Sequence, residues 1–137
     1  MLVPVKFHYR VIEVTVAVGR MSNAAIQRTL VQNDTGPKLR LTLQDSYGNP
    51  LNLVSGVQAV NFYLRPAHAD DYVNVGHEAC SGFDLANGVV DYAFQQGDLS
   101  GTGTHFGDVE LVYDSGEKET SFDEVRFLVR PSNHRLG

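Results

Sequence analysis

The side chains best suited to chemistry fall in the middle of the chain, where histidines and carboxylates follow one another. His68, Asp70 and Asp71 lie close together, and His77 and Glu78 come soon after. Carboxylate and imidazole ligands of this kind bind hard or borderline cations. Their spacing matches no EF-hand loop, no His-Glu-x-x-His motif and no compact zinc pattern. We therefore interpret this segment as a solvated acidic loop, and we expect neither a metal nor another cofactor.

Residues that could act as a nucleophile or a general base are isolated from one another. His105, at the entrance to a predicted strand, is the best single candidate for a general base, but the sequence offers it no partner. Ser81, Ser100 and Ser115 each adjoin a glycine, yet none stands in a Gly-x-Ser-x-Gly motif. Cys80 has no adjacent Lys or Arg to lower its pKa, so we expect a buried and unreactive thiol. The sequence predicts no catalytic residue.

Composition bounds the class of protein that must hold these residues. The chain has 137 residues, is 42% hydrophobic and 20% charged, and carries a net charge of −5, which predicts one folded domain. A single cysteine excludes an internal disulfide framework and a multi-cysteine zinc site. The negative charge disfavours general nucleic-acid binding. Lys6, Arg10 and Glu13 interrupt the apolar stretch that comes nearest to a membrane span, so we expect neither nucleic acid nor membrane as a partner.

From residue 26 onward the chain has the pattern of short β-strands separated by turns. Leu39, Leu41 and Leu43 alternate with polar residues, which is typical of a strand with one buried face. Further strands are predicted around residues 60–65, 72–75, 90–94, 106–113, 117–122 and 125–129. A change of alternation near Gly107 predicts a bulge. Seven to eight short strands with regular turns predict an all-β fold, an immunoglobulin-like antiparallel β-sandwich.

Residues 1–30 differ from the rest of the chain in charge and in pattern. They carry four basic residues against one acidic residue, whereas the remainder has seven basic and fifteen acidic residues. Their apolar residues alternate first on odd and then on even positions, which predicts a strand with a bend. Neither a secretory signal peptide nor a helical targeting leader has this pattern. We expect an N-terminal β arm that lies along a sheet edge of this molecule or of a neighbour.

These patterns divide the chain into three parts. Residues 1–30 form an N-terminal arm for docking, residues 31–131 form the β-sandwich domain, and residues 132–137 form a short C-terminal tail. Met21 leaves open a second possible translation start, and residues 1–20 would lie outside the native chain if translation began there. The predicted interface consists of apolar residues of the arm and two outward-facing tyrosines: Val3, Val5, Phe7, Tyr9, Val14, Val16, Val18, Tyr63 and Tyr72.

Several motifs, taken in order, resemble the N-terminal domain of phage baseplate upper proteins. They are Asn33-Asp34-Thr35-Gly36-Pro37 with the following leucines, the turn at residues 45–50, the strand end Phe62-Tyr63-Leu64-Arg65-Pro66, the block from Asn87-Gly88 to Gly97-Asp98, and the strand at residues 103–113. Asn33 replaces the family's usual first glycine, Phe106 stands where the family has a tyrosine, and an extra residue precedes Glu110. The resemblance covers roughly residues 31–130.

The resemblance implies a structural protein of the phage virion and not an enzyme. Such a module would be a small tail or baseplate adaptor or decoration protein. It would dock onto tail, baseplate, fibre or capsid proteins and would anchor fibres or receptor-binding proteins. Multiple copies would form a symmetric assembly, which would be built in the bacterial host cytoplasm. Two alternatives stay open: a carbohydrate-binding module that binds a host glycan through Tyr47, Tyr63 or Tyr72, and a capsid decoration or head-fibre protein.

Overall fold

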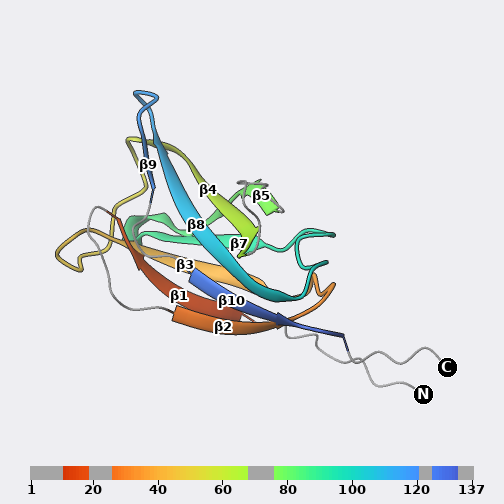
Figure 1. Cartoon of the computed structure of the whole chain (residues 1–137). Helices are drawn as coiled ribbons and strands as arrows, with labels where there is room; N and C mark the ends of the chain where they lie inside the picture. The colour runs from red at the N-terminus through yellow and green to blue at the C-terminus, as the bar shows by residue number, and fades with distance from the viewer. Residues whose placement is uncertain (1–10, 19–25, 68–75, 121–124, 133–137) are drawn as a thin grey trace, which may run out of the picture.

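The computed structural model describes residues 11–18, 26–67, 76–120 and 125–132. In these residues ten strands form two sheets packed face to face, and one short 3-10 helix, η1 (Leu85–Asn87), precedes a strand (Figure 1). The predicted all-β sandwich is confirmed. The structure contains more strands than the seven to eight predicted, because three of them have only three or four residues. Within the described residues, no helix is long and apolar enough to cross a membrane.

One sheet has four strands in the order β1 (Val11–Ala17), β3 (Lys38–Gln44), β7 (Val89–Ala93) and β6 (Ser81–Asp84). The β1 strand runs parallel to β3, and the other two pairs are antiparallel. The alternation predicted for β3 is confirmed, since Leu39, Leu41 and Leu43 are fully buried. A strand with this pattern buries every second side chain against the opposite sheet.

The second sheet has six strands. Its main order is β2 (Ile26–Val31), β10 (Val125–Arg130), β8 (Gly103–Tyr113), β4 (Val57–Pro66) and β5 (Gly76–Ala79), and the short β9 (Lys118–Thr120) also pairs with β8. The first half of β8 pairs with β10, whereas its last residues pair with β9. In Figure 1 the long β8 strand crosses in front of the four-stranded sheet.

The N-terminal strands belong to the sandwich, which corrects the predicted boundary after residue 30. The β1 strand forms an edge of the four-stranded sheet, and β2 runs parallel to β10 at an edge of the six-stranded sheet. The Arg28 side chain joins the two strands, because its Nη2 donates to the carbonyl oxygen of Glu13 over 3.3 Å. Apolar side chains of β1 cover one side of the core. Two parallel pairs thus replace the purely antiparallel arrangement that the sequence predicts.

Aromatic side chains fill the centre of the core. The rings of Phe62, Tyr92, Phe94 and Phe127 are buried, with neighbouring centroids 4.7 to 6.3 Å apart. Gly107 lies on β8 against this cluster, where an added Cβ would come within 2.5 Å of Cζ of Phe62. The bulge predicted near Gly107 is absent from the register of β8 with β4 and β10; the irregularity lies in β4 instead, between Val57 and Ala59.

Candidate docking surface

The β6 strand leaves one edge of the four-stranded sheet open. Among the described residues it pairs with β7 alone, and all four of its residues are exposed. On the opposite sheet, β5 pairs with residues 61–64 of β4, and within the part of the chain that the structure describes residues 57–59 of β4 have no strand partner on that side. Two strand edges from different sheets therefore border the same opening. Unpaired backbone groups along such edges are a template for pairing with another chain.

A cavity of about 140 Å³ lies between these two edges and is partly open to solvent. Its walls come from the loop before β4, the start of β4, the residue between β5 and β6, and from β6, η1 and β7: Leu53, Val57, Gln58, Ala59, Val60, Cys80, Gly82, Leu85 and Val90. The lining residues are uncharged, but polar and apolar atoms both contribute to the lining surface. The cavity has the size to receive one side chain.

Cys80 stands where the chain crosses from one sheet to the other. Its backbone N–H donates to the carbonyl oxygen of Val60 over 2.7 Å, and its side chain lines the cavity. Burial, with a smaller contribution from the charge of Asp91, raises the pKa of the Cys80 thiol to about 12. Because the thiolate is the reactive form, Cys80 is unreactive near neutral pH, as its sequence neighbours predict. It contributes to the cavity as a small apolar group.

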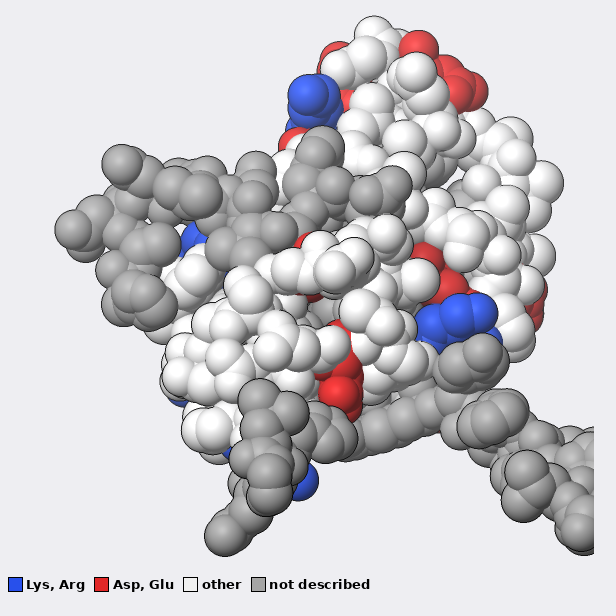
Figure 2. Space-filling view, turned by 90° about the vertical axis from the view of Figure 1, so that its right-hand side faces the viewer, with Lys and Arg blue, Asp and Glu red and all other residues white. Residues whose placement is uncertain are grey.

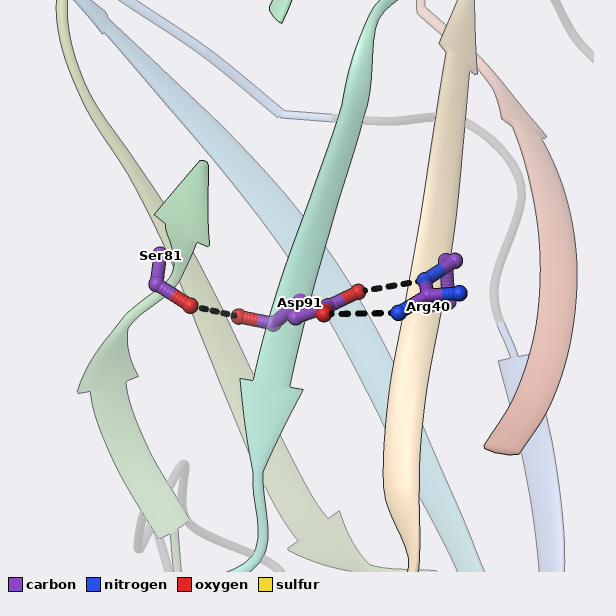
Figure 3. A network of polar contacts seen from close by, with 3 residues as sticks. All are labelled: Arg40, Ser81 and Asp91. Carbon is purple, nitrogen blue, oxygen red and sulfur yellow. Dashed lines mark hydrogen bonds and ion pairs between the residues drawn. The ribbon is translucent and has the colours of Figure 1, made fainter. Parts of the chain in front are cut away.

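An ordered network covers the outer face of the same sheet (Figure 3). Arg40 donates from Nε to Oδ1 of Asp91 over 2.9 Å and from Nη2 to Oδ2 over 3.1 Å. The Ser81 hydroxyl donates to the carbonyl oxygen of Asp91 over 3.4 Å. Asp91 is buried, and its hydrogen bond raises the pKa of Arg40 above the ordinary value. A bidentate pair of this kind fixes the orientation of the guanidinium group.

Phe83 lies against this fixed guanidinium group. The Cζ atom of Arg40 is 3.5 Å from the centroid of the Phe83 ring, and the Phe83 side chain is 57% exposed. Cation–π contact holds the ring before any partner arrives. An exposed aromatic side chain that is already ordered loses little entropy on binding, which is a property of residues that dominate interface energies.

Leu85 lines the cavity, and Val54 follows the lining residue Leu53 in the sequence; both are exposed apolar residues. Leu85 is 40% exposed and Val54 is 64% exposed. The backbone N–H of Leu53 donates to the carbonyl oxygen of Leu85 over 2.8 Å and so brings the two segments together. We use the name β6 surface for the surface formed by Val54, Phe83, Leu85, the cavity and the outer edge of β6. Clustered exposed apolar groups of this kind mark interaction sites more often than scattered ones do.

The structure places the predicted interface residues differently from the sequence analysis. Val14, Val16 and Val18 are buried in the chain's own core because β1 pairs with β3, so their side chains do not form a docking surface in this fold. Val3, Val5, Phe7, Tyr9 and Tyr72 lie outside the described residues. Tyr63 is half-buried, and its hydroxyl donates to Oε1 of Glu110 over 2.9 Å. Burial and this carboxylate raise the pKa of Tyr63.

The sequence analysis missed Phe83. Ser81-Gly82-Phe83-Asp84 contains turn-forming residues on both sides of the aromatic ring, and a strand of four residues is too short to show an alternating pattern. The one available signal was a phenylalanine among small and polar residues, where no core pattern explains it. This signal indicates that the ring of Phe83 is exposed, but it does not show that Arg40 lies against the ring.

The candidates for catalysis do not form a site among the described residues. His105 is fully buried on β8, and its Nδ1 is 3.1 Å from the carbonyl oxygen of Gly103. A histidine enclosed in the core has no path to a substrate. In the parts of the chain that the structure describes, no group of three or more metal-ligating residues occurs. His68, Asp70 and Asp71 lie outside the described residues, and the side chains of His77 and Glu78 are not described.

Figure 2 shows the side of the molecule that lies to the right in Figure 1. Most of the described surface on this side is uncharged, and the basic groups that it shows lie beside acidic groups. A nucleic-acid-binding domain usually gathers Lys and Arg on one face or stripe. The described surface of this side has no such stripe, in line with the negative net charge.

The β8–β9 hairpin carries a tyrosine that links stability to alkaline pH. The Tyr113 hydroxyl donates to Oε2 of Glu119 over 2.7 Å, and burial together with this carboxylate raises the pKa of Tyr113 to about 12. The unfolded chain would lose the proton near pH 10. The stabilisation is therefore complete below pH 10 and is lost as the pH rises toward 12.

We expect the unfolding free energy to fall less steeply between pH 10 and 12 in Tyr113→Phe than in the unmodified protein. Urea unfolding followed by circular dichroism at several pH values in this window measures the difference. Tyr47→Phe is the matched control, because the Tyr47 side chain is 88% exposed. Equal slopes for all three proteins would contradict the assignment.

The comparisons with known proteins support the fold. No family model matches the chain, and no curated protein sequence matches it. Among solved structures the fold is similar to the N-terminal domain of phage TP901-1 ORF48, with a TM-score of 0.65 and 17% sequence identity over 88% of this chain and 98% of that chain. CopC from Methylosinus trichosporium OB3b has a TM-score of 0.48 at 10% identity, covering 88% of this chain and 99% of its own.

Fibronectin(III)-like modules of CbhA from Clostridium thermocellum have a TM-score of 0.46 at 15% identity, covering 86% of this chain and 99% of their own. The two sheets packed face to face define the class of this fold as the β-sandwich domain. Within that class, the phage TP901-1 ORF48 domain shares the architecture over nearly its whole length. At 17% sequence identity, this likeness shows a shared fold.

Proposed function

We propose that the protein is a non-enzymatic structural component of a phage virion. It serves as a small tail or baseplate adaptor or decoration module that docks to other virion proteins and anchors fibres or receptor-binding proteins. The observation that carries this proposal is the fold shared with the N-terminal domain of phage TP901-1 ORF48 over 88% of the chain. The order of the sequence motifs supports it independently, because that order points to the same group of phage proteins.

The β6 surface supports a docking role. It joins an exposed aromatic ring held by Arg40, an open cavity with an uncharged lining, and a strand edge that has no partner among the described residues. Interfaces draw most of their energy from a few aromatic and arginine side chains around which apolar groups exclude water. Phe83 on Arg40 provides such a centre, and Leu85 and Val54 provide its apolar surroundings.

In this proposal the N-terminal docking element is residues 1–10, a shorter segment than the predicted arm of residues 1–30. The inward-facing side chains of residues 11–18 are buried in the chain's own core and are therefore not available as apolar contacts for a neighbour. Residues 1–10 precede β1 and keep an alternating apolar pattern together with Lys6 and Arg10, and they contain no acidic residue. The rest of the sequence after residue 30 is acidic, so a basic segment is suited to contact acidic neighbours in an assembly.

We expect the protein to co-purify with phage particles. Gradient-purified virions analysed by mass spectrometry should contain the full-length chain. Deletion of residues 2–10 should reduce its incorporation at least tenfold while leaving the circular dichroism spectrum unchanged, because all described strands remain. A matched control is Leu128→Ser, which alters another exposed leucine far along the chain on β10. Absence of the full-length protein from the particles would overturn the proposed function.

A carbohydrate-binding role is the second candidate, and one observation favours it. Tyr47 is 88% exposed at the tip of a turn. The turn is ordered by Asp45, whose Oδ1 accepts the backbone N–H groups of Tyr47 and Asn49 over 2.8 and 3.0 Å. These bonds lower the pKa of Asp45. Glycan-array binding that is lost in Tyr47→Ala and kept in Tyr63→Ala would establish this role, and an array without any bound glycan would exclude Tyr47 as its platform.

A further inference from the structure

The opening beside β6 has the features of a site for an added β-strand. Among the described residues, the outer edge of β6 and residues 57–59 of β4 have no strand partner beside the cavity, so both sides of the cavity present backbone donors and acceptors. An extended segment can satisfy a row of such groups, because its own N–H and C=O groups alternate along the chain. A helix or a rigid loop has no matching row.

A strand added to β6 would also fill the cavity. Successive side chains of a strand point to opposite faces of its sheet. Every second residue of the added strand would therefore point inward over the wall formed by Val57, Cys80 and Leu85. The residues between them would point outward beside the exposed ring of Phe83. The site thus selects a segment that is apolar at every second position.

The first ten residues of this chain have that pattern. Val3, Val5, Phe7 and Tyr9 are apolar or aromatic, and they are separated by Pro4, Lys6 and His8. Proline is tolerated near the beginning of an edge strand. No other segment outside the described residues has seven consecutive positions that keep this alternation.

Charge also matches the segment to the site. Residues 1–10 carry Lys6 and Arg10 and no acidic residue. The cavity lining contains no charged residue. Asp84 at the end of β6 is exposed, and so is Asp114, whose backbone N–H donates to the carbonyl oxygen of Gly56 over 3.0 Å, just before β4. A basic strand therefore meets an acidic rim.

The distance across the sheet favours a donor from a second copy. The β1 and β6 strands are the two outer strands of a four-stranded sheet, so three spacings of roughly 4.8 Å separate them, about 14 Å in total. A chain advances at most about 3.3–3.6 Å per residue. Crossing the sheet would consume at least the four residues that precede Val11, and these include Phe7 and Tyr9 of the alternating pattern. A neighbouring copy delivers residues 3–9 without this loss.

We propose that residues 3–9 of one copy add to β6 of a second copy and place an apolar side chain in the cavity. This inference rests on the proposed assembly function and names its partner, a second copy of this chain. The contact is heterologous, since the donor and the acceptor are different surfaces. Repeated contacts of this type close into a ring or extend into a filament.

Two variants separate the donor from the acceptor. Deletion of residues 2–9 removes the donor and leaves β6 intact. Leu85→Lys blocks the acceptor, because it places a positive charge at the cavity in front of the basic donor. Leu85 is 40% exposed, so the lysine reaches solvent and the sandwich keeps its fold. Leu128→Lys is the matched control, since Leu128 is 38% exposed on the other sheet.

Light scattering during size-exclusion chromatography gives the decisive result. The full-length protein and Leu128→Lys should form oligomers, and each of the two variants alone should be a monomer, with self-association weakened by about a hundredfold or more. An equimolar mixture of the two variants should give a dimer, because one supplies the donor and the other the acceptor. If the deletion disturbs the fold by circular dichroism, a full-length Val5→Asp, Phe7→Asp double variant replaces it.

A monomeric full-length protein, or a mixture of the two variants that stays monomeric, would overturn the inference. The same result leaves the proposed function standing if the monomeric protein is still found in purified virions. Conversely, oligomers that depend on Leu85 in a protein absent from virions would support the strand addition and overturn the virion role. Each of the two proposals, the virion function and the strand addition, can therefore be overturned without the other.

Discussion

Gly88→Ala should lower the unfolding free energy by about 3 kcal/mol or more. Gly88 follows η1 with φ of 76°, and an added Cβ would lie 2.6 Å from the carbonyl oxygen of Leu43 and 2.8 Å from that of Leu51. The left-handed conformation alone costs a non-glycine residue roughly 1–2 kcal/mol. Overpacking adds about 1–3 kcal/mol, and here the neighbours are backbone atoms that cannot rotate away. Urea unfolding measures the change.

Gly48→Ala separates these two costs. Gly48 has φ of 85°, but an added Cβ would have no neighbour within 4 Å. We expect a loss of about 1 kcal/mol for Gly48→Ala, because only the conformational cost remains. If both variants lost the same free energy, the close backbone contacts at Gly88 would not be the cause. Gly88 also ends the turn that holds Leu85 beside the cavity, so its replacement should weaken self-association as well.

Asp98→Ala should lower the unfolding free energy by about 2–4 kcal/mol. The Asp98 carboxylate is 3% exposed and accepts the hydroxyl of Tyr92 over 2.5 Å and the backbone N–H of Gln95 over 2.9 Å. Removing it leaves two donors in or beside the core without their acceptor, at about 1–3 kcal/mol for each buried group. Thermal or urea unfolding detects a loss of this size.

Two matched variants test the origin of the loss at Asp98. Asp114→Ala removes an exposed carboxylate and should change the unfolding free energy by less than about 0.5 kcal/mol. Tyr92→Phe removes one of the two donors and should have an intermediate effect. In the double variant the two losses should not add, because both remove the same hydrogen bond. Additive losses would show that the two side chains act separately.

The sequence predicts the fold class well because one pattern repeats. Leucines at every second position of β3 mark its buried face, and the same alternation holds along β10. The alternating pattern fails to predict the strand at Gly107. Because glycine has no side chain, the sequence does not show that this position faces the core, although β8 continues through it without a break. The rings of Phe62 and Phe127 occupy the space of its missing side chain. That space belongs to other strands, and no local pattern can show it.

The docking surface was harder to predict for two physical reasons. An alternating pattern shows that one face of a strand is buried, but it does not show what buries it. The alternation therefore predicts Val14 and Val16 as interface residues, whereas in the structure both side chains are buried in the chain's own core. The arrangement of Phe83 on Arg40 and Asp91 requires three strands that are neighbours in space and up to 51 residues apart in the sequence. A pattern among neighbouring residues in the sequence cannot predict a contact between such distant strands.

The parallel pairing of β2 with β10 sets an order for folding during synthesis. Ile26 pairs with Val125, so β2 waits for its partner until the segment around residue 125 has been synthesised. Long-range pairings of this kind form slowly. Throughout that interval β2 lacks the strand with which it pairs in the described sheet, whereas β1 already has β3. A neighbouring nascent copy offers the same partner strands, so we expect folding and assembly of this protein to compete for one set of strand edges.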